Sequence, residues 1–245
     1  NEENLEAAVT GLKTCGIRGF NLTMPNKNKI VELLDELSPE AQLIGAVNTV
    51  LNDNGKLIGY NTDGYGFMQS VRDAGHDITG KNITVMGVGG ASMAICAQSA
   101  LDGAASVHIF ARRTSRYWNR TQKFAENLSA KTGCQVCLFD NDDHTALRNS
   151  IAQSYLLINA TSVGMVPDID DTIIKDTSLF HPELVVADVV YEPQETRLLR
   201  EAKAAGCQTF NGMYMLLHQG AKAFQIWTGQ EMPVSVIKEK YFSVK

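Results

Sequence analysis

Two patterns of hydrophobic and polar positions divide the chain. Between about residues 82 and 211, short apolar runs alternate with stretches in which apolar residues recur every three or four positions. This alternation is typical of a parallel sheet with helices on both faces. The runs LVVADVV (184–190) and YLLIN (155–159) are almost continuously apolar, as strands covered on both faces require. The predicted fold class is therefore α/β.

The boundaries of these elements follow from the same pattern. The predicted strands span 82–88, 106–111, 134–140, 155–161, 184–191 and 207–210. The predicted helices between them span 92–101, 118–131, 145–153 and 196–205.

The first 77 residues have a different pattern of apolar and polar positions. The pattern predicts helices at about 2–14 and 26–37, a strand at 17–23 and a hairpin at 48–62. Asn54-Gly55 supplies the hairpin turn, because both residues adopt positive φ readily. Ser38 and Pro39 have the residue types of an N-cap and a first helical position, so another short helix is expected to begin there.

Three segments result from this division. Residues 1–77 are predicted to form one domain, 78–211 a second, and 212–245 helices that return to the first domain. The stretch 75–82 is the expected boundary or hinge. The chain begins without Met and inside an amphipathic helical pattern, so we expect the natural protein to start upstream.

Composition restricts the class of protein. The 245 residues carry a formal net charge of -5, with 44% hydrophobic and 20% charged residues, values ordinary for a soluble globular protein. No basic tail or Lys/Arg stripe is present, which argues against a nucleic-acid partner. No apolar run approaches membrane-spanning length, and the start lacks the features of a signal peptide. A cytoplasmic protein is expected.

The cysteines do not predict a metal site. Five are scattered along the chain, and the CQVC spacing at 134–137 has no second Cys or His pair to complete it. That segment is a predicted strand, in which residues three apart face opposite sides. Free thiols in a reducing compartment are the better interpretation.

A glycine-rich turn after the strand at 82–88 indicates a dinucleotide site. In GVGGAS (87–92), Gly87 permits a tight turn and Gly89 lets the backbone approach a pyrophosphate at the start of the next helix. Ser92 stands where the usual fingerprint has a third glycine. The strand before the motif and the helix after it favour a nucleotide site over an ordinary strand–turn–helix corner.

The end of the second strand bears on the choice of cofactor. An acidic residue there would bind the ribose hydroxyls of NAD, but the chain reads FARRTSR (110–116). Guanidinium groups grip a 2′-phosphate with charge-assisted bonds, so NADP is the predicted cofactor. NAD remains open, because arginines also stack on adenine, and a solvated basic loop is the alternative.

Seven motifs in order resemble the shikimate dehydrogenase family, including its quinate/shikimate branch. They are NLTMPNK, GAVNTV, GYNTDG, GVGGAS, NATSVGM, DVVYEPQETRLL and NGMYMLLHQGAKAFQIW. The resemblance covers nearly the whole chain. It implies a substrate domain, a Rossmann domain that binds NADP or NAD, and reversible oxidation of the C3 hydroxyl of shikimate or quinate. That reaction belongs to aromatic amino-acid biosynthesis.

The resemblance also implies site residues. Lys27 and Asp63 match the catalytic pair, which also binds substrate, and Thr23, Asn48 and Gln219 match further substrate contacts. The implied cofactor contacts are Val88, Gly89, Gly90, Ala91, Ala111, Arg112, Arg113, Thr114, Val189, Tyr191 and Gly212. No metal is implied. A homodimer is compatible with the sequence, which carries no signal for the oligomeric state.

Three departures from the family pattern stand out. The N-terminal S-x-S motif that binds the substrate carboxylate is absent, so it is expected upstream, and the sequence cannot rank shikimate against quinate. The usual N-R-T after the second Rossmann strand is replaced by Arg112-Arg113-Thr114 following Ala111. Ser162 occupies a position where the quinate/shikimate branch has Lys.

The chemistry supports the assignment of Lys27 from first principles. Hydride transfer to a ketone leaves negative charge on oxygen, so a proton donor must lie beside that oxygen. Lys27 can supply the proton while Asp63 fixes the ammonium, and we treat them as one unit. Lys27 could instead be an ordinary surface lysine, and Asp63 only the N-cap of the next helix. For the whole chain, the alternative is a non-catalytic NAD(P)-binding module. Such a module would predict decay of the substrate half, whose expected residues are all present.

Overall fold

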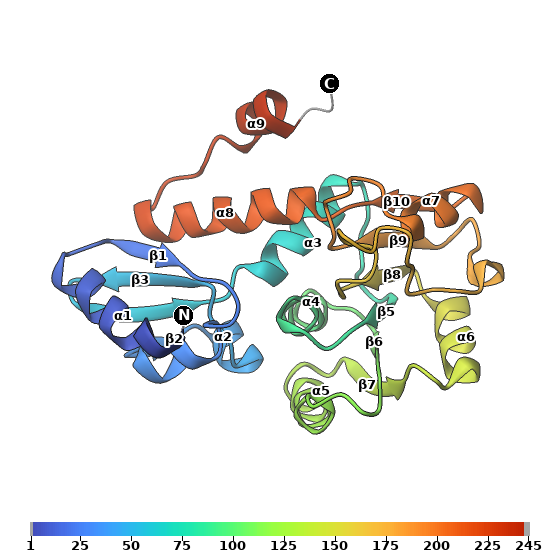
Figure 1. Cartoon of the computed structure of the whole chain (residues 1–245), viewed down its shortest axis with the longest axis horizontal. Helices are drawn as coiled ribbons and strands as arrows, with labels where there is room; N and C mark the ends of the chain where they lie inside the picture. Colours follow the sequence, from blue (N-terminus) through green and yellow to red (C-terminus); the bar gives the residue numbers. More distant parts are fainter. Residues whose placement is uncertain (1, 243–245) are drawn as a thin grey trace.

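A sheet of six parallel strands forms the larger lobe of the computed structural model, which describes residues 2–242 (Figure 1). The strands are β5 (Asn82–Met86), β6 (Ser106–Ala111), β7 (Gln135–Asp140), β8 (Leu156–Asn159), β9 (Val185–Asp188) and β10 (Gln208–Phe210). Their order is β10-β9-β8-β5-β6-β7, the order of a doubly wound dinucleotide-binding sheet. The predicted α/β class is confirmed.

Both faces of this sheet are buried. Along β8, Leu156 and Ile158 pack into the core shared with α3, α4 and α5, whereas Leu157 packs into the core shared with α6 and α7. This alternation explains why the strand is apolar at every position. The helices are α3 (Asp63–Asp73), α4 (Gly90–Leu101), α5 (Trp118–Thr132), α6 (His144–Gln153) and α7 (Arg197–Ala204). A 3-10 turn, η3 (Thr177–Leu179), precedes β9.

The smaller lobe is built on a four-stranded sheet. Its strands are β1 (Gly19–Asn21), β2 (Glu36–Leu37), β3 (Thr49–Asp53) and β4 (Lys56–Tyr60), in the order β1-β3-β4-β2. Its helices are η1 (Glu2–Asn4), α1 (Leu5–Thr14), η2 (Lys29–Leu33) and α2 (Pro39–Ile44). The β3–β4 turn has φ values of 53° at Asn54 and 92° at Gly55, and Ser38 caps α2 by accepting the Ala41 amide at 3.2 Å. The predicted hairpin and N-cap are confirmed.

The helix predicted at 26–37 is wrong. Only the 3-10 turn η2 forms there, and Leu34 is already extended, with φ −106° and ψ 144°. Glu36 and Leu37 then pair in parallel with β4, and the Asp35 carboxylate accepts the Leu57 amide at 2.7 Å. The edge of β4 has backbone N–H and C=O groups that would lack partners if residues 34–37 stayed helical. Pairing with this edge therefore outweighs the helical spacing of the apolar residues.

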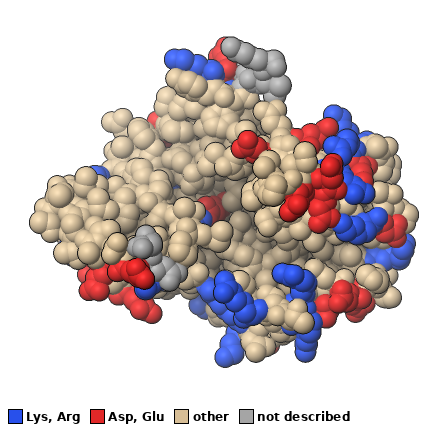
Figure 2. Space-filling model, in the orientation of Figure 1, with Lys and Arg blue, Asp and Glu red and all other residues tan. Residues whose placement is uncertain are grey.

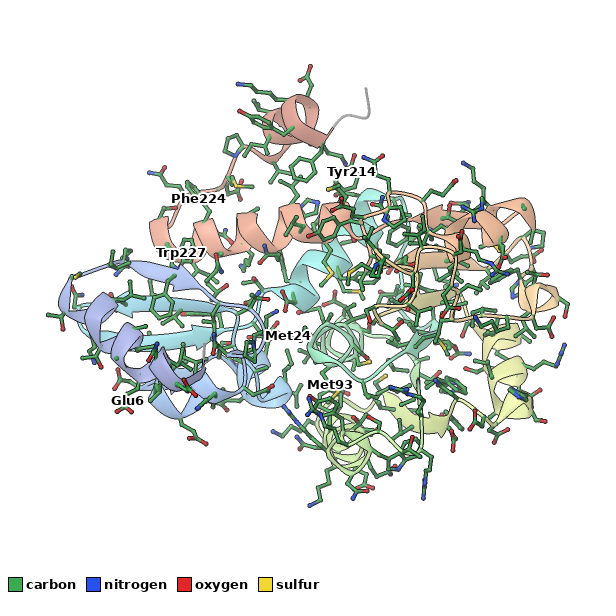
Figure 3. All side chains as sticks on the ribbon, viewed as in Figure 1. Glu6, Met24, Met93, Tyr214, Phe224 and Trp227 are labelled. Carbon is green, nitrogen blue, oxygen red and sulfur yellow. The ribbon has the colours of Figure 1, made fainter. Side chains whose placement is uncertain are left out.

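Helix α8 (Met213–Thr228) leaves the large lobe and returns across the small one (Figure 1). Near its end, the indole nitrogen of Trp227 donates to the Val50 carbonyl of β3 at 2.9 Å (Figure 3). A Cβ at Gly19 would lie 2.1 Å from that nitrogen, so glycine is required beneath the ring. The last elements of the described part are α9 (Val234–Ile237) and a π-helical turn (Lys238–Phe242). Residues 1 and 243–245 of the predicted outer segments lie outside the described part.

Candidate active site

Lys27 lies in the turn after β1, with its side chain directed at the start of α3. Its carbonyl accepts the Val47 amide at 2.8 Å, which fixes the backbone of the turn against the strand that leads into β3. Its Nζ lies 2.6 Å from Oδ2 of Asp63, and only 18% of the Lys27 side chain and 10% of the Asp63 side chain are exposed. The structure therefore brings the predicted pair together in a largely buried setting.

Asp63 is the first residue of α3 and not its N-cap. Thr62 holds the N-cap position, while the Asp63 carboxylate receives Lys27 on one oxygen and the Asn48 amide on the other, at 2.8 Å. The alternative that made Asp63 an N-cap is wrong, because both carboxylate oxygens are committed to side chains. The helix start still favours a negative charge at this position.

Asn48 connects the pair to a third element. Its Nδ2 also lies within hydrogen-bonding distance of Thr62 Oγ1, at 3.0 Å, and of Gln219 Oε1 on α8, at 3.4 Å. Its Oδ1 accepts the Thr62 amide at 2.9 Å, so the orientation of the Asn48 amide is fixed. Thr23, the remaining predicted substrate contact, is exposed on the turn that holds Lys27.

A groove of about 1250 Å³ follows the carboxyl ends of β5, β6, β8 and β9. It exceeds the roughly 300–1,000 Å³ typical of small-ligand pockets, so an extended ligand such as a dinucleotide fits its size. All the predicted cofactor residues line it except Arg113 and Gly212. Figure 2 shows the hollow between the lobes, with Lys and Arg side chains gathered around α5 below it.

The glycine-rich turn has the geometry of a phosphate cradle. Gly87 has φ 109° and packs on Thr161, whereas a Cβ at Gly89 or Gly90 would project into open space. Gly89 caps α4, whose first amides therefore face the groove. The Ser92 hydroxyl donates to the Gly87 carbonyl at 2.6 Å, so the serine in the place of the third glycine braces the turn. These residues fit a bound pyrophosphate.

The arginines after β6 point in different directions. Arg112 and Arg116 line the groove together with Thr114. The guanidinium of Arg113 instead lies 4.6 Å from the centre of the Trp118 ring. Gly212 lies outside the groove lining as well; a Cβ there would come within 2.1 Å of the Val189 carbonyl, so Gly212 supports the groove wall from behind.

A smaller chamber of about 120 Å³ joins the two lobes. Met24 and Lys27 line it from the small lobe, and the turn 88–90 and Met93 line it from the large lobe. Figure 3 shows Met24 and Met93 beside the gap between the lobes. The chamber brings the Lys27 side chain to the same space as the phosphate cradle.

A buried carboxylate supports the floor of the groove beside Tyr191. Asp188, at the end of β9, is fully buried and accepts bonds from Asn159 Nδ2 at 3.0 Å, the Val190 amide at 3.0 Å and Thr196 Oγ1 at 2.7 Å. Burial raises the pKa of Asp188 despite these bonds. The network joins the ends of β8 and β9 to the start of α7, which fixes the turn that carries Tyr191.

Several groove residues were not predicted from the sequence. Met24 and Tyr117 line both cavities, and Asn141 and Thr161 line the groove. Asn141 and Thr161 follow β7 and β8 closely, so the rule that ligands bind at the carboxyl ends of parallel strands would have found them. Met24 and Tyr117 carry no such signal.

Residues 2–242 hold neither a cluster of metal ligands nor a membrane-spanning helix. No group of three or more His, Cys, Asp or Glu side chains in that range is arranged to hold a metal ion, and its cysteines are unbonded. No helix in the same range has both the length and the apolar character needed to cross a membrane.

Comparison with known proteins identifies the family. Residues 1–50 match the model of the shikimate dehydrogenase substrate binding domain, and residues 212–240 match that of the shikimate 5'-dehydrogenase C-terminal domain. A Listeria innocua protein named shikimate dehydrogenase (NADP(+)) is 50% identical over 98% of this chain and 82% of its own length. An Escherichia coli quinate/shikimate dehydrogenase is 41% identical over 98% of this chain and 83% of its own.

A solved structure extends the likeness to three dimensions. Shikimate 5-dehydrogenase from Listeria monocytogenes, in complex with shikimate and NAD, has a TM-score of 0.93 and 50% identity, covering 97% of this chain and 82% of that one. Sequence and fold agree over both lobes. The chain belongs to the shikimate dehydrogenase family.

Proposed function

We propose that the chain is an NADP-dependent shikimate dehydrogenase that interconverts shikimate and 3-dehydroshikimate by hydride transfer. The observation that carries the proposal is the Lys27–Asp63 pair, held at 2.6 Å beside a chamber shared with the phosphate cradle. A relative named for this activity and for NADP supports it, at 50% identity. The presence of the whole Lys27–Asp63–Asn48 network argues against a non-catalytic NAD(P)-binding module.

The residues of the small lobe act on the substrate in this proposal. Lys27 gives a proton to the ketone oxygen during reduction and takes it back during oxidation. Asp63 holds the ammonium in place, and Asn48 fixes Asp63 by donating to its second oxygen. Thr23 and Gln219 complete the set of hydroxyl contacts. Residues 1–77 therefore serve the substrate, with α8 contributing from 212–245.

The residues of the large lobe, within 78–211, bind the cofactor in this proposal. The turn 88–91 receives the pyrophosphate, and Arg112, Thr114 and Arg116 surround the adenosine end. Val189 and Tyr191 lie at the other end of the same groove. A nicotinamide cofactor held in this groove would supply the hydride donor or acceptor for the C3 carbon of the substrate.

Steady-state kinetics with four substrate–cofactor pairs tests the function. Shikimate and quinate are each oxidised with NADP and with NAD, and kcat/KM is compared. We expect shikimate with NADP to give the largest value. The quinate/shikimate relative makes quinate the second candidate, and comparable values for both acids would favour that branch. No turnover with any pair would contradict the proposal.

Lys27→Ala tests the mechanism. Removing a general acid–base group lowers kcat by about 10²–10⁴-fold, whereas the fold should persist because Asp63 keeps its bond from Asn48. Lys29→Ala is the matched control: this exposed lysine lies two positions on and lines neither cavity. A Lys27→Ala enzyme with the wild-type kcat would remove this lysine from the reaction.

We also propose that the protein is cytoplasmic. The cysteines of residues 2–242 are free, which supports a reducing compartment.

A further inference from the structure

The helix that begins with Asp63 meets its two neighbours at buried glycines. A Cβ added at Gly64 would lie 2.4 Å from the carbonyl oxygen of Ala94 in α4. A Cβ added at Gly66 would lie 2.7 Å from the backbone nitrogen of Gln219 in α8. Neither glycine has a positive φ, so the need for glycine is steric and not conformational.

Each neighbouring helix carries another part of the site. Helix α4 begins at Gly90, inside the phosphate cradle, one turn before the Ala94 carbonyl. Helix α8 carries Gln219, whose backbone is the surface that Gly66 touches. Helix α3 stands between them with Asp63 at its first position (Figure 1). The spacing of the three helices is therefore set by contacts with backbone atoms.

These contacts cannot be relieved by rotating a side chain. Carbon and carbonyl oxygen approach no closer than about 3.3 Å, so a methyl group at Gly64 requires a relative shift of α3 and α4 of about 1 Å. A misplacement of about 1 Å at a reacting centre costs up to about 10²-fold in rate.

We infer that Gly64 and Gly66 are positioning residues for the reaction. Gly64 sets the separation between Asp63 and the nucleotide-binding end of α4, and with it the approach of cofactor to substrate. Gly66 sets the position of Gln219 against Asn48, and with it the fit of the substrate. This inference rests on the proposed function and adds two residues that touch neither substrate nor cofactor.

Alanine substitution at the two positions should give different kinetic signatures. Gly64→Ala should lower kcat by about 10–100-fold with little change in KM for shikimate. It should also enlarge the kinetic isotope effect measured with shikimate deuterated at C3, because hydride transfer becomes slower than product release. Gly66→Ala should raise KM for shikimate about tenfold with a smaller change in kcat and an unchanged isotope effect.

Controls separate this effect from loss of folded protein. Gly11→Ala places a Cβ in the exposed helix α1 with nothing within 4 Å, and should keep full activity. Circular dichroism and thermal melting report folding, and NADP affinity by fluorescence titration should be unchanged because neither glycine lines the groove. If Gly64→Ala does not fold, Ser99→Thr adds one methyl group elsewhere in the α3–α4 interface, beside Met68, and should lower kcat by a smaller factor with KM for shikimate unchanged.

The outcomes distinguish two failures. Folded variants with wild-type kinetics, or with the same change in kcat and KM at both positions, would overturn the positioning role. If the wild-type enzyme does not oxidise shikimate at all, the proposed function itself is contradicted. An active wild type with indistinguishable variants contradicts this inference alone.

Discussion

Neighbouring arginines in the loop after β6 have different partners, which assigns them different roles. Arg112 and Arg116 reach the groove, and Arg116 also donates to the Tyr117 hydroxyl at 2.6 Å. Arg113 lies over the Trp118 ring at the start of α5. Of these arginines, Arg112 and Arg116 are therefore the ones placed to face a 2′-phosphate in the groove, whereas the sequence also suggested Arg113.

Alanine substitutions in this loop test that division. Arg116→Ala and Arg112→Ala should weaken NADP binding by about 10–100-fold, the value of a charge-assisted bond, with a smaller loss for NAD. Arg113→Ala should weaken the two cofactors equally and lower stability by about 0.5–2 kcal/mol, the worth of a cation–π contact. Fluorescence titrations with both cofactors measure the ratio of the NADP and NAD dissociation constants for each variant. The largest selective loss of NADP in Arg113→Ala would contradict this assignment.

The proximity of residues that belong to short local motifs could be predicted from the sequence. Lys27, Asp63 and the turn 87–92 fall within short motifs, and the structure places them at one crevice. The stacking of Arg113 and the position of Tyr117 could not be predicted, because they depend on how the loop enters α5. The bond between Asn48 and Gln219 joins residues 171 positions apart, so only the returning helix reveals it.

Helices α3 and α8 are also joined at the end of α3 that lies away from the active site. Asp73, the last residue of α3, accepts bonds from His218 Nε2 at 2.9 Å, Lys238 Nζ at 3.3 Å and Gln69 Nε2 at 3.2 Å. Burial opposes ionisation, but the bonds from His218 and the other donors hold the pKa of Asp73 below its ordinary value. The carboxylate connects α3, α8 and the C-terminal turn.

Asp73→Ala should lower the free energy of unfolding by about 1–3 kcal/mol, because the buried His218 ring loses its partner. The contribution of Asp73 is present above the ordinary aspartate pKa and is lost as the pH falls through the lowered value. Asp53→Ala is the control: its pair with Arg18 is exposed, so about 0–1 kcal/mol is expected. Urea unfolding at pH 7 measures both, and equal losses would refute the role of Asp73.

The strands of the large sheet were predictable, whereas the short strand β2 of the small sheet was not. The six strands of the large sheet were each predicted within a few residues, because their apolar runs reflect burial that any parallel sheet imposes. The segment 26–37 has helically spaced apolar residues, yet it ends as β2 on the free edge of β4. Whether this segment forms helix or strand depends on pairing partners 22 residues further along the chain, which a local pattern does not contain.

The pH dependence of the stability of the whole molecule should reflect two half-buried histidines, one in the larger lobe and one at its boundary. His108 bonds to Ser150 Oγ at 2.8 Å, and His76 bonds to the Tyr155 hydroxyl at 2.9 Å. Burial lowers the pKa of both rings. The folded state therefore holds them neutral at a pH where the unfolded chain binds protons.

The sign of the pH dependence follows from linkage. Below the ordinary histidine pKa of about 6.5, the unfolded state takes up more protons than the folded state, so the free energy of unfolding falls as the pH is lowered from 7 toward 5.5. His108→Gln should reduce the slope of the unfolding free energy against pH by the equivalent of at most about one proton. The unfolding free energy above pH 7.5 should change less. Denaturant titrations across this range measure it, and an unchanged slope in the variant would contradict the prediction.

The path of α8 determines when each lobe can be completed during synthesis. Trp227 and its helix cover the sheet that contains β1 and β3, although its partner Val50 on β3 leaves the ribosome 177 residues earlier. The six-stranded sheet, by contrast, is complete once β10 has emerged. A nascent chain can therefore complete the large lobe first, while one face of the small lobe stays uncovered until α8 has been synthesised. Termination before α8 should leave a folded large lobe joined to a small lobe with an exposed apolar face.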